Sequence, residues 1–272
     1  MTLEPDDVAF RALTRKISQA RGFSCEAYKD KCLKRRIAVR MRARGVHTYG
    51  DYAALLDRDD LEYQQLLDAL TINVTKFYRN AEMWNALAPH LAALWRGRHG
   101  HLTCWSAGCA SGEEPYTLAV MLAEAARAAG AEPQLARCRV DATDIDRVSL
   151  ERTRSAAYPA SAFVEMPPIL VQRYFTGGDT REPVPAIKRL VKVIPLDLVR
   201  EPPPDAPYDL ITCRNVVIYF DRESQERLFL RFADALRPGG VLVLGKVETL
   251  FGPARERLTL LDARERIYRR PE

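Results

Sequence analysis

The sequence predicts an α/β protein with a mostly parallel main sheet, preceded by an all-helical N-terminal region. From about residue 101 onward, short apolar segments alternate with amphipathic ones, which is typical of a doubly wound sheet with helices on both faces. Before residue 100, apolar residues recur at helical spacing and no segment has the character of a strand. These two observations divide the chain into a helical part and a sheet part.

The helical part begins at residues 5–7, where a proline and two acidic residues are typical of a helix start, and this helix ends at Gly22. A second helix is expected over residues 28–44, with Leu33, Ile37 and Met41 on one apolar stripe. Two more are expected over residues 52–57 and 61–70. Residues 1–75 are therefore assigned to a helical domain, and residues 76–100 to a linker with a bridging helix over 83–94.

Residues 101–272 are assigned to the sheet domain. Strands are expected over residues 102–107, 138–143, 191–194, 209–213 and 241–244. Helices are expected over residues 113–129, from 148 to 154, and over 224–236, and a turn at residues 238–240. Residues 174–194 fit the alternation poorly, so a small antiparallel β-subdomain is expected at about 174–196.

The composition indicates a soluble, folded chain. Of 272 residues, 47% are hydrophobic and 28% charged, which excludes a mainly disordered chain. No apolar run approaches the roughly 20 residues that span a bilayer, and residues 1–10 lack the pattern of a secretory signal. The six cysteines form no Cys-x-x-Cys pair and the four histidines are scattered, so we expect free thiols, no metal site and a cytoplasmic location. The net charge of +5 hints at an acidic partner.

The strongest local motif lies at residues 105–116, where a strand, a glycine-containing loop and a helix follow one another. Gly108 and Gly112 allow a ligand to approach the backbone closely, yet the spacing matches neither the dinucleotide fingerprint nor a P-loop. Glu113 and Glu114 at the helix start disfavour a pyrophosphate, and Asp144 after the next strand is a natural acceptor for ribose hydroxyls. The pattern favours S-adenosylmethionine over NAD. In the alternative interpretation, the two glutamates only stabilise the helix dipole.

Two further segments are candidates for a site. Residues 73–79 contain Asn73, Thr75 and Arg79, although for this motif in isolation a helix cap is the better explanation. Residues 213–221 leave a strand with Arg214 and later Tyr219, which are unusual side chains for a plain strand exit.

The second predicted helix is densely basic. Its charge exceeds what solubility requires, although a solvated charged face is the ordinary explanation. An acidic partner is favoured; nucleic acid is the rival partner, but no aromatic interleaving or groove-reading motif supports it. The basic residues are Lys29, Lys31, Lys34, Arg35, Arg36, Arg40, Arg42 and Arg44, of which Arg36, Arg40 and Arg44 form one row.

Taken in order, five motifs resemble the CheR family of chemoreceptor glutamate methyltransferases, over about residues 7–269. The motifs are Leu-Lys-Arg-Arg-Ile at 33–37, Asn-Val-Thr and Phe-Tyr-Arg within 73–79, Trp-Ser-Ala and Gly-Glu-Glu-Pro-Tyr within 105–116, Ala-Thr-Asp-Ile-Asp at 142–146, and Cys-Arg-Asn-Val-Val-Ile-Tyr-Phe-Asp at 213–221. The resemblance implies a Rossmann-like methyltransferase sheet with a small β insertion, preceded by an all-α substrate-recognition domain.

The resemblance also implies the roles of residues. Arg79, Tyr219 and Arg214 would be catalytic, with Arg79 and Tyr219 nearest the transferable methyl group. The cofactor S-adenosyl-L-methionine would be bound, without a metal, by Asn73, Thr75, Arg79, Glu114, Asp144, Asp197, Leu198, Arg214 and Asn215. The acidic methylation helices of chemoreceptors would dock on Lys34, Arg35, Arg36, Arg40 and Arg44. Other proteins of the signalling array are further partners that the resemblance allows; nucleic acid and membrane insertion are not expected.

The implied reaction converts receptor glutamates to methyl esters and leaves S-adenosyl-L-homocysteine, as in chemotaxis adaptation. Two departures from the family pattern bear on the substrate. The insertion between Tyr174 and Asp197 is shorter than in enterobacterial relatives, which predicts recognition without a receptor C-terminal pentapeptide. Gly-Lys-Val-Glu at residues 245–248 stands where many relatives have Gly-His-Ser-Glu. Methylation of RNA or a small molecule, and a non-catalytic scaffold that binds the cofactor, are the alternatives.

Overall fold

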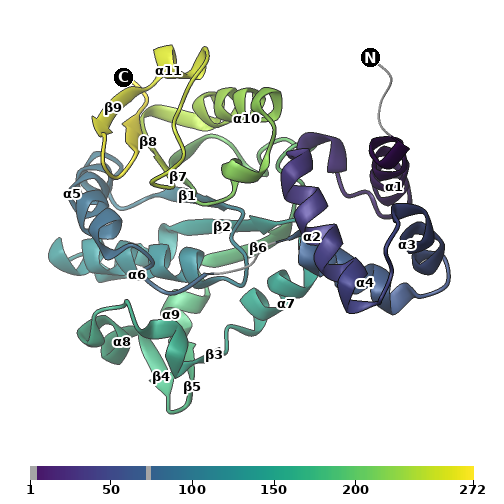
Figure 1. Ribbon diagram of the computed structural model, residues 1–272. Coiled ribbons are helices and arrows are strands. Elements are labelled where there is room, and N and C mark those ends of the chain that lie inside the picture. The colour runs from purple at the N-terminus through teal and green to yellow at the C-terminus, as the bar shows by residue number, and fades with distance from the viewer. Residues whose placement is uncertain (1–4, 72–74) are drawn as a thin grey trace. The chain divides into compact units, whose positions relative to one another are not determined.

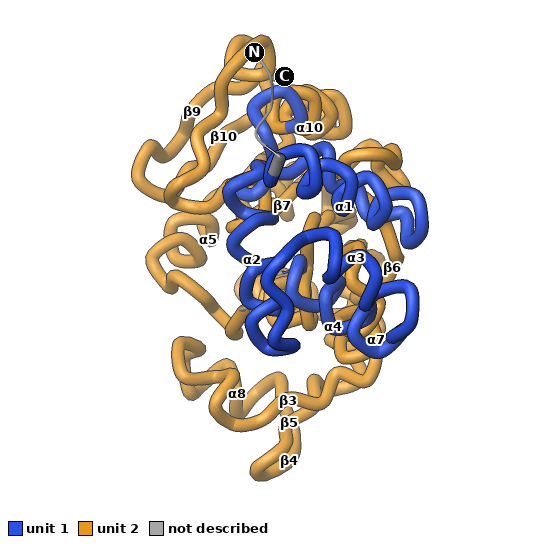
Figure 2. The backbone as a smooth tube through the Cα atoms, turned by 45° about the vertical axis from the view of Figure 1, so that its right-hand side comes forward, with its two compact units in different colours: residues 1–72, 219–224 blue, residues 73–218, 225–272 orange. Residues whose placement is uncertain are grey.

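The computed structural model describes residues 5–71 and 75–272, and the chain divides into two compact units. Unit 1 comprises residues 1–72 and the short segment 219–224, and unit 2 comprises residues 73–218 and 225–272 (Figure 2). None of the helices in the described ranges combines the length and the apolar character that crossing a bilayer requires.

Unit 1 is helical. Its helices are α1 (Pro5–Arg21), α2 (Asp30–Ala43), α3 (Tyr49–Leu56) and α4 (Asp60–Leu70), with the 3₁₀ turn η1 (Cys25–Ala27) between the first two. α1 packs against α3, and α2 packs against α4 (Figure 1). The predicted stripe of Leu33, Ile37 and Met41 is buried, because residues at this spacing share one face of a helix. Thr48 and Asp59 cap the starts of α3 and α4 by accepting backbone N–H bonds.

The segment 219–224 is held in unit 1 by backbone and aromatic contacts. The Lys29 N–H donates to the Tyr219 carbonyl at 3.0 Å, and the Asp221 N–H donates to the Ala27 carbonyl at 2.8 Å. The rings of Tyr28 and Phe220 meet edge to face, with centroids 5.0 Å apart. The chain thus returns to the helical unit late in the sequence.

Within the described residues, unit 2 is built on a seven-stranded sheet in the order β6-β2-β1-β7-β8-β10-β9 (Figure 1). The first five strands in this order are parallel to their neighbours, and β10 and β9 pair antiparallel. The predicted α/β fold is therefore confirmed. The strands are β1 (Thr103–Ala107), β2 (Arg139–Asp144), β6 (Val191–Pro195), β7 (Tyr208–Cys213), β8 (Leu236–Leu244), β9 (Thr259–Asp262) and β10 (Ile267–Arg269).

Helices cover both faces of this sheet. On one face, α5 (Ala81–Gly97), α6 (Glu113–Ala128) and α9 (Pro185–Lys188) share a core with Cys104 of β1. On the other face, the next residue of β1, Trp105, packs its ring 5.4 Å from that of Phe232 in α10 (Arg222–Ala235). α7 (Arg147–Ser155) lies on the first face, with α5 and α6, where its Leu150 packs against Ala142 of β2. Successive strand residues point to opposite faces, so both faces of each central strand are buried.

A second, three-stranded antiparallel sheet has the order β3-β5-β4. It is formed by β3 (Tyr158–Pro159), β5 (Thr180–Pro183) and β4 (Phe175–Gly177), accompanied by η3 (Ala160–Phe163) and α8 (Pro168–Tyr174). The small sheet thus begins earlier than expected, at Tyr158, and β6 pairs with β2 in the main sheet. A strand of two residues, such as β3, has no periodicity that a sequence could reveal.

Residues 238–240, expected to form a turn, lie inside β8. The register of β8 against β7 shifts there, since Tyr208 pairs with Leu236 whereas Leu210 pairs with Val241. Gly239 has φ +77°, so the backbone bulges without leaving the sheet.

The antiparallel strands β9 and β10 were not expected. The remaining elements are η2 (Glu132–Arg137), η4 (Val217–Tyr219) and α11 (Ala254–Arg257).

Candidate functional site

Three predicted site segments meet at one edge of the main sheet. β1, β2 and β7 are parallel neighbours, so their carboxyl ends lie at the same edge. The loop 108–112 follows β1, Asp144 ends β2, and Arg214 follows β7. The edge therefore gathers residues that are far apart in the sequence.

The loop after β1 makes a tight turn onto this edge. The N–H groups of Gly108 and Cys109 donate to the Thr143 carbonyl at 2.8 and 2.9 Å. Gly108 has φ +78°, and a Cβ there would lie 2.5 Å from Val216. Gly112 has φ +101°, and a Cβ there would lie 2.5 Å from the Tyr158 hydroxyl. Both positions require glycine for lack of space as well as for backbone conformation.

Glu114 points its carboxylate at the ends of β1 and β7. Its Oε1 accepts hydrogen bonds from Ser106 Oγ at 2.8 Å and Thr212 Oγ1 at 2.7 Å, and its Oε2 lies 3.4 Å from Arg214 Nη1. Ser106 and Thr212 are paired across the two strands. Glu113, in contrast, is buried and accepts from Ser111 Oγ, and burial raises the pKa of its carboxyl group. The structure thus places Glu114, which was predicted to bind the cofactor, at the strand ends and gives Glu113 a separate buried contact.

Arg214 is buried, with 3% of its side chain exposed. Its Nη2 donates to the Arg79 carbonyl at 2.8 Å and to Asn80 Oδ1 at 2.9 Å. Its guanidinium carbon lies 5.5 Å from the centroid of the Trp84 ring. Burial lowers the pKa of Arg214, and the charge of Glu114 opposes this effect. Arg214 Nε is buried without a hydrogen-bond partner among the described residues.

Asp144 is buried at the end of β2. Its Oδ2 accepts from the Ala110 N–H and its Oδ1 from the Asp146 N–H, both at 2.9 Å. Burial raises the pKa of Asp144, while these backbone N–H groups act in the opposite direction. Burial also raises the pKa of the Cys213 thiol, and the negative charges of Glu248, Glu114 and Asp144 reinforce the effect. These three carboxylates are therefore near enough to the Cys213 thiol to oppose its ionisation.

The segment before α5 is anchored to unit 2 at several points. The Tyr78 N–H donates to Thr117 Oγ1 at 3.1 Å, and the Phe77 N–H donates to the Ala162 carbonyl at 3.0 Å. Arg79 and Thr75 are half-buried. Asn73, predicted to bind the cofactor, lies outside the described residues.

The other predicted cofactor residues follow β6 and β7. Asp197 Oδ1 accepts from the Val199 N–H at 2.8 Å, and Leu198 is buried. Asn215 has φ 61° and donates its N–H to Glu248 Oε2 at 3.0 Å. Sequence reasoning noted Glu248 only as part of a variable loop. It also missed Asn80, Ser106 and Thr212, although a polar pair at the ends of two buried strands was a usable signal.

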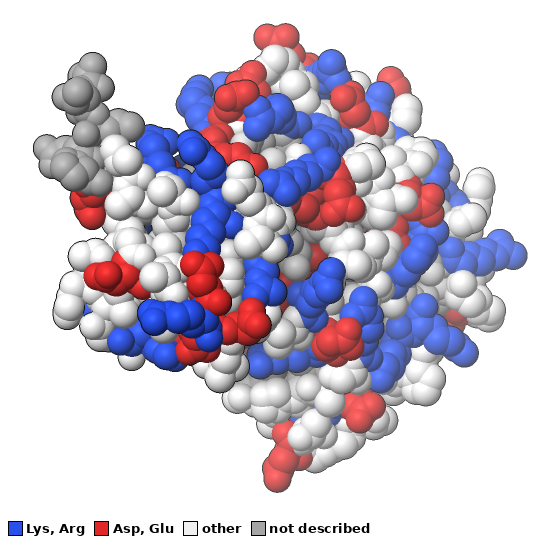
Figure 3. Space-filling view, turned by 90° about the vertical axis from the view of Figure 1, so that its right-hand side faces the viewer, with Lys and Arg blue, Asp and Glu red and all other residues white. Residues whose placement is uncertain are grey.

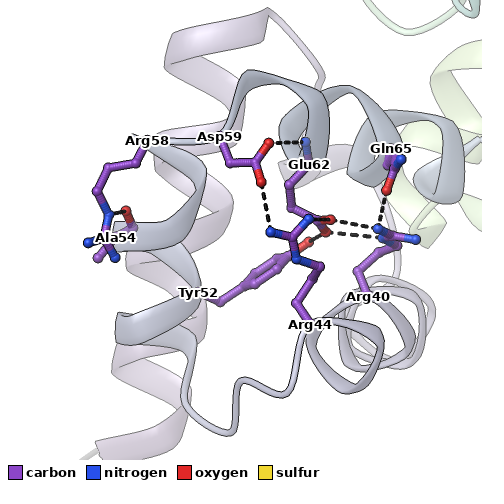
Figure 4. Close-up of polar contacts among 8 residues, drawn as sticks. All are labelled: Arg40, Arg44, Tyr52, Ala54, Arg58, Asp59, Glu62 and Gln65. Carbon is purple, nitrogen blue, oxygen red and sulfur yellow. Dashed lines mark hydrogen bonds and ion pairs between the residues drawn. The ribbon is translucent and has the colours of Figure 1, made fainter.

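The basic residues of α2 do not form one uniformly exposed row. Arg40 binds Glu62 with two hydrogen bonds, of 3.1 and 2.6 Å, and Arg44 lies 2.8 Å from Asp59 and 3.5 Å from Glu62 (Figure 4). The Glu62 side chain is fully buried and also accepts from the Tyr52 hydroxyl at 2.6 Å. Lys34 pairs with Asp7 at 2.5 Å, whereas Arg35 is exposed. This part of the predicted docking set thus has partners within unit 1.

Arg36 is also buried in unit 1. Its Nη1 donates to the Leu70 carbonyl, and its guanidinium carbon lies 4.5 Å from the centroid of the Tyr219 ring. Its Nε and Nη2 atoms are buried without hydrogen-bond partners among the described residues. Arg36 therefore contacts Tyr219, predicted to be catalytic, while Arg79 belongs to unit 2.

Comparison with known proteins identifies the family. Residues 9–71 match the family model of the CheR methyltransferase all-alpha domain, and residues 73–267 match that of the CheR methyltransferase SAM-binding domain. The chain belongs to the CheR methyltransferase family. It is a SAM-dependent methyltransferase of the chemotaxis type, as the resemblance of its five motifs implied.

Several CheR relatives are described as chemotaxis protein methyltransferases. That of Klebsiella aerogenes is 37% identical over 253 residues, covering 89% of this chain and 83% of the relative. That of Salmonella typhimurium is 35% identical, with 92% and 86% covered, and that of Listeria innocua is 32% identical, with 96% of both covered. Among solved structures, the N-methyltransferase NodS from Bradyrhizobium japonicum matches with a TM-score of 0.39 and 17% identity, covering 69% of this chain and 87% of that chain.

The site residues fit the SAM cofactor of the CheR family. A carboxylate has about four lone-pair positions, and Asp144 uses one on each oxygen, which leaves acceptor capacity for ribose hydroxyls. Glu114 Oε2 has one long contact and can accept from an ammonium group. Glu114 and Asp144 together suit a ligand that carries positive charge and hydroxyl groups. Among the described residues, no group of three His, Cys, Asp or Glu side chains is arranged to hold a metal ion.

Proposed function

We propose that this CheR family member methylates glutamate side chains of chemoreceptors, giving glutamyl methyl esters and S-adenosyl-L-homocysteine. The observation that carries the proposal is the buried contact of Arg214 with Glu114, Asn80 and the Arg79 carbonyl. It links three of the five sequence motifs at the carboxyl edge of the sheet. The family match and the chemotaxis relatives support the choice of reaction.

The proposed chemistry needs no general base. An ordinary glutamate has a pKa of about 4.3 and is ionised at neutral pH. When bound, the cofactor supplies a methyl group on a positively charged sulfur. The protein then has to orient the carboxylate, bind the cofactor and exclude water. In this proposal Asp144 binds the ribose and Glu114 the cofactor's ammonium group, Arg79 orients the incoming carboxylate, and Tyr219 donates a hydrogen bond to it.

For Arg214, the contacts favour a supporting role over direct contact with substrate. Both of its Nη atoms face groups of this chain, and only Nε has no partner among the described residues. We infer that Arg214 fixes the main chain of Arg79 and the carboxylate of Glu114. In this proposal Arg79, which is half-buried, contacts the carboxylate of the substrate, and Arg214 does not.

The proposed partner is the acidic methylation helix of a chemoreceptor in the cytoplasm. The exposed basic residues Lys31, Arg35 and Arg42 of α2 are the proposed contacts, because Arg40 and Arg44 already pair with carboxylates of unit 1. On the face drawn in Figure 3, basic and acidic side chains are interspersed. A local set of exposed basic residues on one helix therefore explains recognition better than a continuous basic surface.

We also propose that recognition does not require a receptor C-terminal pentapeptide. A peptide that binds by strand addition needs an edge strand with several free backbone groups. The edge strands of the small sheet, β3 and β4, have two and three residues. Such short edges offer few backbone partners. Binding of an isolated pentapeptide to the full chain, measured by calorimetry, would contradict this part of the proposal.

A methyl-transfer assay tests the proposed reaction. Purified protein, S-adenosylmethionine with a labelled methyl group and the cytoplasmic part of a chemoreceptor from the same source are mixed, and the receptor is then treated with mild base. Release of the label as methanol is expected, because carboxyl methyl esters are base-labile. Label that stays on the receptor, or that enters RNA from the same source and not the receptor, would overturn the proposal.

A further inference from the structure

Glu248 lies in the loop after β8 and is buried, with 3% of the residue exposed. Its Oε2 accepts hydrogen bonds from the Gly245 N–H at 2.6 Å and the Asn215 N–H at 3.0 Å. Its Oε1 accepts from the Ile218 N–H at 3.2 Å. Each of these partners is a backbone donor, so both oxygens must act as acceptors, as those of an ionised carboxylate do.

These bonds fix a segment that has an uncommon conformation. Asn215 has φ 61°, in the left-handed region that costs energy for a residue other than glycine. A Cβ at Gly245 would lie 2.6 Å from Glu248 Oε2 and 2.9 Å from the Asn215 nitrogen, so the two loops are in close contact. The same carboxylate thus joins the loop after β8 to the residues that leave β7.

The residues that leave β7 form part of the proposed site. Arg214 directly precedes Asn215, and Val216 is the side chain that packs over Gly108. Burial raises the pKa of Glu248, and the N–H groups of Gly245, Asn215, Ile218 and Val216 oppose this effect. Within the described part of the chain, the hydrogen-bond partners of this carboxylate are backbone N–H groups, so it orders the loop rather than taking part in chemistry.

We propose that Glu248 is a positioning residue that holds residues 215–218 in the conformation that binds the cofactor, before the cofactor arrives. This inference rests on the proposed placement of the cofactor at the carboxyl edge of the sheet. Glu248 acts through the backbone of Asn215 and Ile218, not by touching the cofactor. The loop of residues 245–248, which departs from the family pattern at Lys246 and Val247, thereby takes part in cofactor binding through its unchanged glutamate.

The test compares two substitutions that preserve side-chain volume. Glu248→Gln replaces one acceptor oxygen by an NH₂ group that faces a backbone N–H. Asp209→Asn is the matched control, since Asp209 is also buried and accepts from the Thr103 N–H at 2.9 Å, but lies near the opposite end of β7. Affinity for S-adenosylhomocysteine is measured by calorimetry, and thermal unfolding is followed in both variants.

We expect Glu248→Gln to weaken S-adenosylhomocysteine binding by about 10-fold or more. Asp209→Asn should lower the melting temperature but keep the wild-type affinity. An affinity of Glu248→Gln within about two-fold of wild type would overturn the inference, as would an equal loss of affinity in both variants. Failure of the wild-type protein to bind S-adenosylhomocysteine would instead overturn the proposed cofactor site.

A second measurement needs no variant and covers the case in which Glu248→Gln does not fold. Hydrogen exchange of the wild-type protein without cofactor reports on the N–H groups of Asn215 and Ile218. A pre-ordered loop predicts that these groups are protected, to a degree comparable with the strand residues of β7. Exchange as fast as in exposed loops, with protection only after S-adenosylhomocysteine is added, would show that the cofactor orders the loop and would overturn the inference.

Discussion

Arg214 donates a hydrogen bond from Nη2 to the main-chain carbonyl of Arg79, 2.8 Å away and 135 residues distant in the sequence. The same nitrogen donates to Asn80 Oδ1, so one buried guanidinium fixes the backbone on which Arg79 stands. An arginine that belongs to the exit of β7 therefore controls the geometry of the segment before α5. In the proposed reaction, the orientation of Arg79 depends on this contact.

Arg214→Lys keeps the positive charge but loses the planar donors that reach several acceptors at once. We expect kcat/KM for receptor methylation to fall about 100-fold, because the main chain at Arg79 is no longer fixed in position. The melting temperature should also fall, since the half-buried Glu114 loses a partner. Arg237→Lys is the control, because Arg237 is partly exposed and lies 3.5 Å from Asp209 at the other end of the sheet.

Arg79→Ala removes the group proposed to orient the incoming carboxylate. Turnover should fall by about 100-fold, because a charged donor at the developing ester is lost. The main-chain carbonyl that Arg214 contacts remains, so the free energy of unfolding should change by less than about 1 kcal/mol. Wild-type turnover in the purified variant would remove Arg79 from the mechanism.

Tyr219→Phe removes the proposed hydrogen-bond donor and keeps the ring that packs under Arg36. We expect turnover to drop by about 10-fold or more while the free energy of unfolding changes by less than about 0.5 kcal/mol. Steady-state kinetics and urea unfolding check the two parts. A variant with normal turnover would show that Tyr219 serves only to pack against α2.

Glu62→Gln tests the buried ion pairs of unit 1. Burial alone would raise the pKa of Glu62, but hydrogen bonds from Arg40 and Tyr52 lower it overall. Its stabilising effect is therefore present above the ordinary glutamate pKa of about 4.3 and is lost as the pH falls through the lower folded-state value. At neutral pH the substitution should destabilise the protein by about 3 kcal/mol, measured by urea unfolding. The difference between variant and wild type should narrow in acid; a difference independent of pH would contradict the assignment.

Arg35→Glu tests docking on α2. Arg35 is exposed, so reversing its charge should raise KM for the receptor fragment by about 10-fold, leave kcat nearly unchanged and weaken the salt dependence of KM. The control is Arg58→Glu, which makes the same change at an exposed position after α3 (Figure 4). Equal effects of the two substitutions would indicate general electrostatic attraction and not a docking site on α2.

The main sheet and the helices of both units could be predicted because their patterns are local. The stripe of Leu33, Ile37 and Met41, and the apolar strands that precede Asp144 and Arg214, follow directly from spacing. The confirmed features are the fold class, the family and the SAM cofactor. The roles of the individual site residues and the division into domains stay predictions.

What the sequence could not supply depends on contacts between distant segments. Arg40 looked like a surface charge because its partner, Glu62, lies 22 residues away on another helix. Glu248 gave no local signal. Its carboxylate oxygens accept hydrogen bonds from backbone N–H groups, which every residue except proline carries. The glycines at 239 and 240 indicated a turn, but they lie within β8, where their backbone groups are hydrogen-bonded to Arg270.

Tyr28 and Phe220 form an isolated antiparallel β-bridge, although they are 192 residues apart in the sequence. Because residues 219–224 belong to unit 1, the two units cannot be exchanged between relatives by a single cut in the chain. A fragment that starts after residue 75 would lose the ring against which Phe220 packs, and would present an aromatic surface that favours aggregation. A chimera that takes its helical unit from one relative and its sheet unit from another would combine α2 and the 219–224 segment from different parents. Such chimeras should work best when residues 219–224 are exchanged together with the N-terminal helices.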